Sequence, residues 1–309
     1  MTESHGVSLV SVGMPVYNGE AFLAEALNSL LIQTHGNLEI IISDNCSSDK
    51  TEQICLEYAA KDSRIRYIRQ DLNIGATANF NYVLQQASGE FFMWAAHDDR
   101  WSPSYVELLH TRVANDGALS FIYGRSKFID QKGKVCGRSI NNFLSPQWLR
   151  NDRKNPDVVN AIAYYLDRSP FKIYGLYRTD AIRKFAFQPF LGSAKYADNV
   201  LLLQFLATYE ADECIEAVHY YRILPRPPEA YSEATNFVQT THFRVEMEYF
   251  KVFVTVLWGR IHWGVLLLTP ILPILLLGAL VKPRAIIVKH WIFSIFPAWI
   301  RSCLRSKAV

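Results

Sequence analysis

Two adjacent aspartates, Asp98 and Asp99, follow His97 at the end of an apolar run of strand length, residues 91–96. A run of this kind ends where a buried strand reaches the edge of its sheet. Carboxylate oxygens suit Mg²⁺ or Mn²⁺, and these ions usually share their coordination with substrate phosphates and water. The pattern therefore predicts a divalent cation, Mn²⁺ or Mg²⁺, held by Asp98 and Asp99. A solvated turn before a helix at Ser102 is the alternative, and the tripeptide alone favours it because short motifs often match by chance.

The segments around this site alternate between strand and helix patterns. Four near-continuous apolar runs predict strands at residues 7–15, 38–43, 65–68 and 91–96. Helical periodicity predicts helices over residues 19–34, from Asp49 as N-cap to about residue 60, and up to Gln86. This alternation is typical of an α/β fold with a mostly parallel sheet covered by helices on both faces. Ligands of such sheets bind beyond the carboxyl ends of the strands.

Polar residues follow each predicted strand at that edge. They are Tyr17 and Asn18, Asp44 and Asn45, Asn73 with Gly75, and His97 with Asp98 and Asp99. Each group alone could be a simple turn, but all of them together predict one shared crevice. A dinucleotide-binding site is disfavoured, because residues 14–19 contain no Gly-x-Gly-x-x-Gly for a pyrophosphate.

Taken together, these motifs resemble the nucleotide-sugar half of the family 2 glycosyltransferases. The resemblance covers about residues 7–230 and rests on segments 12–18, 42–51 and 73–75, on Asn79, and on segment 96–99. It implies the GT-A fold, a Rossmann-like α/β domain in which a divalent ion bridges the protein and a nucleotide diphosphate. It also implies that Asp98 and Asp99 carry the metal-binding Asp-x-Asp role. The family often has Asp where this chain has Ala96.

The resemblance assigns the donor to the strand ends and the chemistry to the second half. The predicted donor-binding residues are Pro15, Val16, Tyr17, Asn18, Asp44, Asn73, Gly75, Asn79, His97, Asp98 and Arg222. For Arg222 the argument is a planar pair of donors for a diphosphate, with a solvated linker as the equal alternative. The predicted catalytic base is Asp198 at the start of an apolar helix, where the family places an Asp, usually after a Glu that is Ala197 here. An N-terminal aspartate without chemical consequence is the alternative.

The second half has a less clear pattern. Residues 117–130 predict a strand pair, 131–134 a hairpin turn, 141–156 acceptor-facing loops, 171–178 a strand with Thr179 capping a short helix, and 212–221 a strand. We expect one glycosyltransferase domain over residues 1–248, with a nucleotide-sugar half at 7–115 and an acceptor half at 116–235.

Residues 249–309 differ in composition from the rest. They contain no Asp or Glu but eight Lys and Arg residues, in a chain of 309 residues with net charge +3. An apolar basic tail argues against nucleic acid as a partner and predicts a hydrophobic, helical, membrane-associated region. Residues 261–281 are long enough to span a bilayer, although Pro270 and Pro273 interrupt them. A single span, a proline-broken hairpin with interfacial helices, and a hairpin buried on the domain remain open.

The compartment follows from the cysteines and the N-terminus. Five cysteines without Cys-x-x-Cys spacing indicate neither a disulfide framework nor a zinc site, and residues 1–6 lack the pattern of a signal peptide. We therefore expect the protein at the cytoplasmic face of the cell membrane.

These patterns and the resemblance predict an inverting, metal-dependent glycosyltransferase. It would move a sugar from a nucleotide-sugar donor, expected to be a UDP-sugar, to a lipid-linked or polysaccharide-precursor acceptor. Asp198 would take the proton of the acceptor hydroxyl. Ala96 and Ala197, at positions where the family often has carboxylates, keep a second hypothesis open: a catalytically silent, membrane-bound nucleotide-sugar-binding or scaffold protein.

Overall fold

The computed structural model of the chain describes residues 8–136, 170–189, 196–224, 248–253 and 255. The chain divides into two compact units. One comprises Met1–Asn141, Pro170–Leu201 and Ala211–Thr235, and the other comprises Asn142–Ser169, Leu202–Glu210 and Asn236–Val309. All the site residues discussed below belong to the first unit. The domain boundaries predicted from the sequence stay a prediction.

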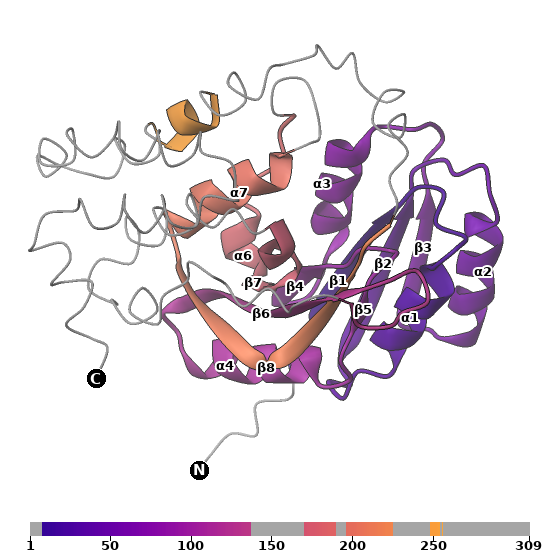
Figure 1. Cartoon of the computed structure of the whole chain (residues 1–309), viewed down its shortest axis with the longest axis horizontal. Coiled ribbons are helices and arrows are strands. Elements are labelled where there is room, and N and C mark those ends of the chain that lie inside the picture. Colours follow the sequence, from indigo (N-terminus) through magenta and orange to yellow (C-terminus); the bar gives the residue numbers. More distant parts are fainter. Residues whose placement is uncertain (1–7, 137–169, 190–195, 225–247, 254, 256–309) are drawn as a thin grey trace, which may run out of the picture. The chain divides into compact units, whose positions relative to one another are not determined.

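Strands and helices alternate through the first part of the chain, as predicted (Figure 1). The elements in order are β1 (Val10–Val16), α1 (Leu23–Leu31), β2 (Leu38–Asp44), α2 (Thr51–Lys61), β3 (Ile65–Arg69), α3 (Ala76–Gln86), β4 (Phe91–Trp94), β5 (Arg100–Trp101), α4 (Tyr105–Asn115), β6 (Leu119–Ile129), η1 (Pro170–Tyr174), β7 (Leu176–Arg178), α6 (Thr179–Ile182), α7 (Ala197–Leu206) and β8 (Glu210–Arg222).

The strands form one sheet with the order β3-β2-β1-β4-β7-β6-β8-β5. β1 runs parallel to β2 and β4, and β2 runs parallel to β3. The first four strands therefore end at the same edge, as the sequence predicted. β7 pairs antiparallel with β4 and β6, and β5 pairs antiparallel with β8. The parallel arrangement thus belongs to the first half of the domain, and the second half extends the sheet with antiparallel strands.

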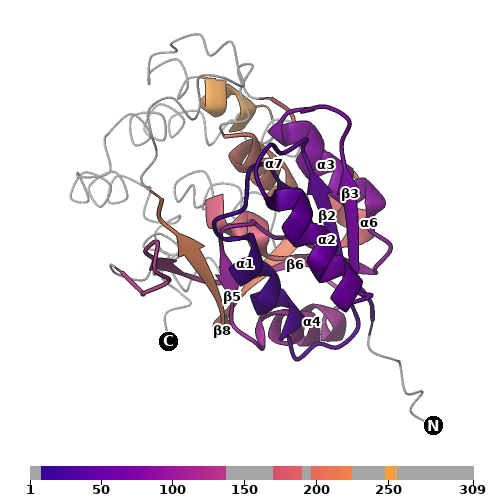
Figure 2. The same cartoon turned by 90° about the vertical axis from the view of Figure 1, so that its right-hand side faces the viewer.

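The chain changes direction across the sheet at β1. From β1 it proceeds outward to β2 and β3, and α3 then carries it back to β4 on the other side of β1. Right-handed crossovers in opposite directions place α1 and α2 on one face of the sheet and α3 on the other (Figures 1 and 2). The carboxyl ends of β1 and β4 form the point where such folds bind ligands.

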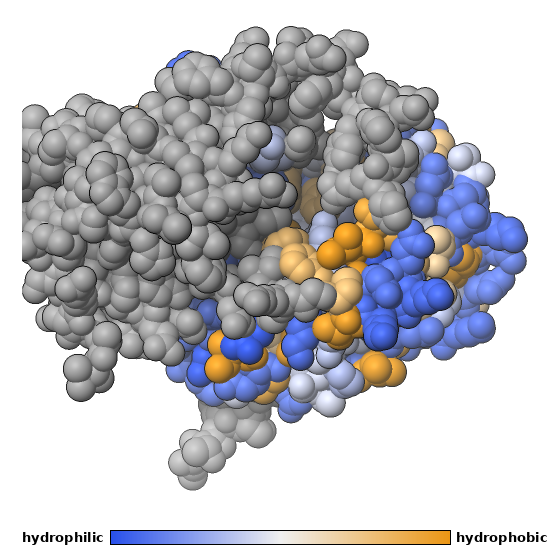
Figure 3. Space-filling view, in the orientation of Figure 1, coloured by the Kyte–Doolittle hydropathy of each residue, from blue (hydrophilic) through white to orange (hydrophobic). Residues whose placement is uncertain are grey.

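Burial on both faces explains the apolar strands. Every residue of β1 and β4 is buried, which a sheet covered on both sides requires. α1 buries Leu23, Ala26, Leu27 and Leu30, one apolar stripe at helical spacing. The described surface over α2 is mostly hydrophilic (Figure 3), so the apolar residues of this half serve mainly as its core.

The structure corrects several predicted elements of the second half. Residues 119–129 form one long strand, β6, and not a strand pair, while the turn after it is confirmed by a bridge between Ile129 and Val135. Residues 171–178 divide between a 3-10 helix and the short β7. Thr179 is the first residue of α6 and not its cap. Its hydroxyl donates a hydrogen bond to the Gly89 carbonyl, at 2.7 Å, instead of to a group of the helix. The short strand β5 was not predicted.

One helix start in the first half is shifted by one residue. The N-cap of α2 is Lys50, although Asp49 accepts the Thr51 N–H at 2.9 Å. The acceptor loops expected at residues 141–156 and the apolar segment 261–281 lie outside the described residues. Among the residues that the structure does describe, no helix has the length and apolar character that crossing a bilayer requires.

Candidate active site

The loops after β1 and β2 are held together by side chains. The Asn18 N–H donates to Ser47 Oγ at 2.9 Å, and the Ser48 N–H donates to Asn18 Oδ1 at 2.9 Å. One step further, the Gly19 N–H donates to Thr51 Oγ1 at 2.8 Å. Asn18 adopts φ 50°, a left-handed conformation that Asn tolerates better than most residues. The two loops are therefore one rigid rim at the carboxyl edge of the sheet.

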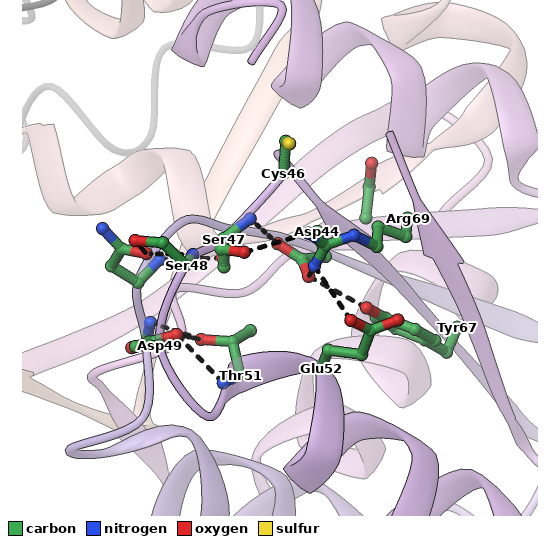
Figure 4. A network of polar contacts seen from close by, with 12 residues as sticks. Asp44, Cys46, Ser47, Ser48, Asp49, Thr51, Glu52, Tyr67 and Arg69 are labelled. Atoms are coloured by element: carbon green, nitrogen blue, oxygen red, sulfur yellow. Dashed lines mark hydrogen bonds and ion pairs between the residues drawn. The ribbon is translucent and has the colours of Figure 1, made fainter. Parts of the chain in front are cut away.

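Asp44, the last residue of β2, is fully buried at this rim (Figure 4). Its Oδ1 accepts the Ser47 N–H at 2.9 Å, and its Oδ2 accepts the Tyr67 hydroxyl at 2.9 Å and Arg69 Nη1 at 3.2 Å. Arg69 also pairs with Glu52 Oε2 at 3.2 Å. Burial and the Asp44 carboxylate raise the pKa of Tyr67 well above its ordinary value, so the phenol stays a donor. The Asp44 carboxylate is thus fixed in place before any ligand arrives.

A second amide network fixes the loop after β3. Asn45 Nδ2 donates to Asn73 Oδ1 at 2.8 Å, and Asn45 Oδ1 accepts the Ile74 N–H at 2.8 Å. Asn73 Oδ1 also accepts the Gly75 N–H at 2.9 Å. Gly75 has φ 84° and ψ 157°, a conformation open essentially to glycine alone. Three loops, after β1, β2 and β3, therefore form one bonded cluster, as the polar groups predicted.

The Asn79 side chain is buried, and its polar atoms are bonded inside the protein. Its side chain is 2 % exposed, its Oδ1 accepts Ser43 Oγ at 2.6 Å, and its Nδ2 donates to the Ser43 carbonyl at 2.9 Å. Both polar atoms of the amide are used to tie α3 to the end of β2. A direct contact between Asn79 and a donor stays a prediction, and the structure gives this residue a supporting position.

His97 and Gly19 meet where β1 and β4 diverge. A Cβ on Gly19 would lie 2.7 Å from Val16 Cγ2 and 2.9 Å from His97 Cδ2, so the missing side chain lets the imidazole approach the loop. Val16 and Pro15 are buried in β1, whereas Tyr17 is 48 % exposed. The structure thus brings the predicted residues Tyr17, Asn18 and His97 to one end of the sheet.

The two aspartates of the acidic pair have different surroundings. Asp98 is half-buried, and within the described part of the chain no other residue makes a hydrogen bond or ion pair with its carboxylate. Burial raises its pKa above the ordinary value, opposed by the neighbouring His97. Asp99 is 1 % exposed, with Oδ2 2.8 Å from His219 Nε2 and Oδ1 accepting the Arg222 N–H at 2.8 Å. Only Asp98 presents open carboxylate oxygens.

Arg222 is also committed to contacts inside the protein. Its side chain is fully buried and bonds three backbone carbonyls and the Glu25 carboxylate. We predicted that Arg222 contacts the donor, but its guanidinium is not open to a ligand in this structure. The alternative, a solvated linker, does not describe this buried side chain either. Arg222 is placed to position the acidic pair.

Asp198 lies in the first turn of α7, as predicted, and is half-buried. Its Oδ1 accepts the Asn199 N–H at 2.8 Å and Asn199 Nδ2 at 3.1 Å. Burial raises the pKa of Asp198, which strengthens it as a base. Oδ2 has no bond to another described residue, so a proton could be accepted there.

The Tyr174 phenol responds to the charges of both the Asp98–Asp99 pair and Asp198. Burial and then the charges of Asp99, Asp98 and Asp198 raise the pKa of its phenol well above the ordinary value. The pKa of this one phenol thus responds to carboxylates of the segment between β4 and β5 and of α7. Tyr174 was not predicted as a site residue, because segment 171–178 has the pattern of a strand.

The carboxylate oxygens of this site suit a divalent ion that the protein holds together with a bound substrate better than an ion enclosed by protein side chains alone. The described residues contain no group of three or more His, Cys, Asp and Glu side chains that could hold a metal. Mg²⁺ and Mn²⁺ are often held by one or two carboxylates and completed by phosphates and water. Asp98 has open oxygens for such an ion, whereas both oxygens of Asp99 are bonded to protein. The chain's residues fit the ion through Asp98, and Asp99 supports it.

Comparison with known sequences identifies relatives over part of the chain. An Escherichia coli UDP-Glc:alpha-D-GlcNAc-diphosphoundecaprenol beta-1,3-glucosyltransferase, WfgD, is 30% identical over 177 residues, covering 56% of this chain and 66% of the relative. The putative teichuronic acid biosynthesis glycosyltransferase TuaG of Bacillus subtilis is 35% identical, covering 52% of this chain and 62% of the relative. An uncharacterized glycosyltransferase of Rickettsia conorii is 39% identical over 130 residues, which are 41% of this chain and 21% of that protein. The chain thus matches about a fifth of that longer relative.

Solved structures share the fold at low sequence identity. Staphylococcus aureus TarS 1-349 in complex with UDP-GlcNAc has a TM-score of 0.60 at 19% identity, over 82% of this chain and 68% of that one. The mannosyltransferase PcManGT of Pyrobaculum calidifontis, in complex with GDP-Man and Mn²⁺, has a TM-score of 0.56 at 16% identity, over 94% and 75%. The family model described as Glycosyl transferase family 2 matches residues 11–168. With motifs, sheet topology and family match in agreement, the chain belongs to glycosyl transferase family 2.

Proposed function

We propose that the chain transfers a sugar from a UDP-sugar to a lipid-linked or polysaccharide-precursor acceptor, with inversion and with the help of a divalent cation. The observation that carries the proposal is that the Asp98 carboxylate and Oδ2 of Asp198 are not bonded to any other residue that the structure describes. One carboxylate belongs to the strand edge where ligands of α/β sheets bind, and the other has a raised pKa suited to a base.

The bonded rim around Asp44 supports a nucleotide as the group held at the strand ends. Its loops are pre-ordered by the contacts of Asp44, Asn45, Asn73 and Asn18, so little ordering would remain on binding. The exposed ring of Tyr17 offers an aromatic face beside this rim. The names of two relatives support the choice of UDP: WfgD uses UDP-Glc, and TarS was solved with UDP-GlcNAc.

Asp98 would hold the cation, whose charge offsets the negative charge that builds on the leaving diphosphate. The Mn²⁺ in PcManGT supports a cation in this fold. The protein supplies the placement: Asp99 is bonded from two sides, which fixes the peptide that carries Asp98. The half-buried position of Asp98 also limits the water around its carboxylate.

Asp198 would accept the proton of the attacking hydroxyl at Oδ2. Its other oxygen is held by Asn199, which fixes the direction of the free one. One base on the acceptor side and direct displacement on the donor side give inversion, with no covalent enzyme intermediate. Tyr174 stays protonated beside these carboxylates and can donate a hydrogen bond to a substrate oxygen.

The proposed acceptor and location rest on relatives and on composition. WfgD acts on a diphosphoundecaprenol-linked sugar by its name, and TuaG is named for teichuronic acid biosynthesis. We propose that the basic apolar residues 249–309 hold the protein at the cytoplasmic face of the membrane. A C-terminal reporter that is active only outside the cytoplasm tests this. Strong external activity would contradict the proposal.

The activity test uses the full-length chain in extracted membranes. UDP-sugars are supplied with Mn²⁺ or Mg²⁺ and a lipid-linked acceptor fraction, and release of UDP and glycosylated lipid are both measured. We expect metal-dependent release that Asp98→Asn and Asp198→Asn abolish. Donor binding without turnover across a broad panel would instead favour a silent scaffold, the hypothesis that Ala96 and Ala197 keep open.

A further inference from the structure

A cluster of charged side chains is built around the buried Arg222, next to the acidic pair Asp98 and Asp99. Arg222, the last residue of β8, has a fully buried side chain. Its Nη2 lies 2.6 Å from Oε2 of Glu25, which belongs to α1 and is 39 % exposed. The other Glu25 oxygen, Oε1, lies 3.0 Å from Nη1 of Arg100, the residue directly after Asp99. Glu25 therefore pairs with two arginines, one from β5 and one from β8, which are neighbouring strands of the sheet.

Arg222 contacts the acidic pair at two points. Its Nε donates to the Asp98 carbonyl at 2.7 Å, and its backbone N–H donates to Asp99 Oδ1 at 2.8 Å. The backbone of Asp98 and the side chain of Asp99 are thus both bonded to one residue. The Asp98 carboxylate itself is left free, which is what an arrangement that aims a ligand-binding group requires.

The remaining contacts fix Arg222 itself. Nη1 donates to the carbonyls of Asp130 and Gln131 at 3.0 and 3.1 Å, and the guanidinium lies 4.4 Å above the Phe22 ring. The planar fork is needed to reach carbonyls and a carboxylate in different directions at once. A lysine ammonium at the same position could not span them.

We infer that Arg222, held by Glu25, is a positioning residue that aims the Asp98 carboxylate and so sets the cation affinity of the site. The inference rests on the proposed function, because it concerns the cation that we assign to Asp98. Removing the guanidinium frees the Asp98 carbonyl and removes one of the two arginine partners of Glu25, yet it removes no atom that would touch the cation.

The chain offers a control for the loss of a guanidinium that bonds backbone carbonyls, in Arg178, whose side chain is 23 % exposed. Arg178 donates to the carbonyls of Leu119 and Val113 at 2.9 Å each, lies 5.3 Å from the Phe91 ring, and pairs with Glu90 at 3.6 Å. It thus makes the same kinds of contact as Arg222 without any bond to the acidic pair. Arg178→Lys therefore reports the general cost of the substitution.

The test is a titration of the full-length protein with Mn²⁺ at fixed UDP, followed by the electron paramagnetic resonance signal of the free ion, with UDP alone as blank. Melting temperatures of all variants are recorded in parallel. We expect Arg222→Lys to raise the dissociation constant of Mn²⁺ about tenfold or more, as loss of a group that orients a metal ligand does. Glu25→Gln should fall between Arg222→Lys and the wild type, and Arg178→Lys should keep the wild-type affinity despite a lower melting temperature.

The outcomes separate the inference from the proposed function. If the wild type binds Mn²⁺ no better than UDP alone, the assigned cation site is wrong and the inference falls with it. If the wild type binds Mn²⁺ and Arg222→Lys binds it equally well, or Arg178→Lys weakens it as much, the inference alone is overturned.

Discussion

Nε2 of His219 lies 2.8 Å from Oδ2 of Asp99, and both side chains are almost completely buried. On its other side, His219 Nδ1 lies 3.2 Å from Ser126 Oγ, and the ring stacks on Trp101 with 5.5 Å between centroids. The second aspartate of the acidic pair therefore belongs to a packed interior network. The two neighbouring carboxylates therefore differ: Asp99 is bonded to His219 and to the Arg222 backbone, whereas the Asp98 carboxylate has no partner among the described residues.

Asp99→Asn should destabilise the fold more than Asp98→Asn. The amide would turn one polar N–H group toward the buried His219 or toward the Arg222 N–H, at a cost of about 1–3 kcal/mol or more. Urea unfolding of the purified chain measures the difference. Equal unfolding midpoints for the two variants would contradict this difference between the carboxylates, and would restore Asp99 as a ligand-facing residue.

Asp98→Asn should leave the melting temperature unchanged or raise it slightly in the absence of ligands. It removes a half-buried charge that has no described partner and whose pKa burial raises. With Mn²⁺ and UDP present, the wild type should gain stability by mass action and the variant should gain much less. Thermal melting of the wild type and the variant, each with and without Mn²⁺ and UDP, tests this. A variant that gains as much as the wild type would remove Asp98 from the cation site.

Asp198→Asn should lower kcat by about 10²–10⁴-fold while leaving donor affinity nearly intact, because the amide keeps the shape and loses the basicity. Single-turnover transfer and donor titration separate the two effects. A variant that retains most of its activity would direct attention to other carboxylates, such as Asp180.

The same variant has a defined pH signature. Since burial raises the pKa of Asp198, the wild-type carboxyl contributes stability below its ordinary pKa and loses that contribution as pH rises through the raised value. Asp198→Asn should therefore be the more stable protein near pH 7, with the difference shrinking in acid. Asp62→Asn is the control, because the Arg64 hydrogen bond lowers the pKa of Asp62 and its difference should have the opposite sign. Parallel curves for both variants would contradict the assignment.

Asp44→Asn should both raise the KM for the donor and lower stability by about 1–3 kcal/mol, because an amide cannot accept from Ser47, Tyr67 and Arg69 together. The sequence suggested an effect mainly on donor binding. Tyr67→Phe removes a single donor and should cost less. A double-mutant cycle on the free energy of unfolding measures the coupling between Asp44 and Tyr67. Additive effects would show that the 2.9 Å hydrogen bond between them contributes no coupling energy.

Gly19→Ala should impair both stability and transfer. The added methyl group would overlap Val16 and His97, and overpacking of this kind costs about 1–3 kcal/mol. Gly36→Ala is the matched control, since a Cβ there meets nothing within 4 Å. If both variants behave alike, the close approach of His97 to the loop has no consequence for the site.

The sequence by itself determined the parallel half of the fold. Four apolar runs, the helices between them and the polar residues at the strand ends predicted β1 to β4 and one shared edge, because strand burial and helix periodicity are local properties that a linear pattern records. The order of the motifs also indicated the family, and the match over residues 11–168 confirms it.

The tertiary structure decided which polar residues stay open. Nothing local in the pattern His97-Asp98-Asp99 distinguishes the two carboxylates, because Asp99 finds its partners at His219 and Arg222, more than a hundred positions later in the chain. The same holds for Tyr174, whose segment has the pattern of a strand, and for Arg222, whose charge suggested an exposed loop. Contacts between distant segments set burial and the hydrogen-bond partners of each polar atom, and these decide whether a side chain supports the site or faces a ligand.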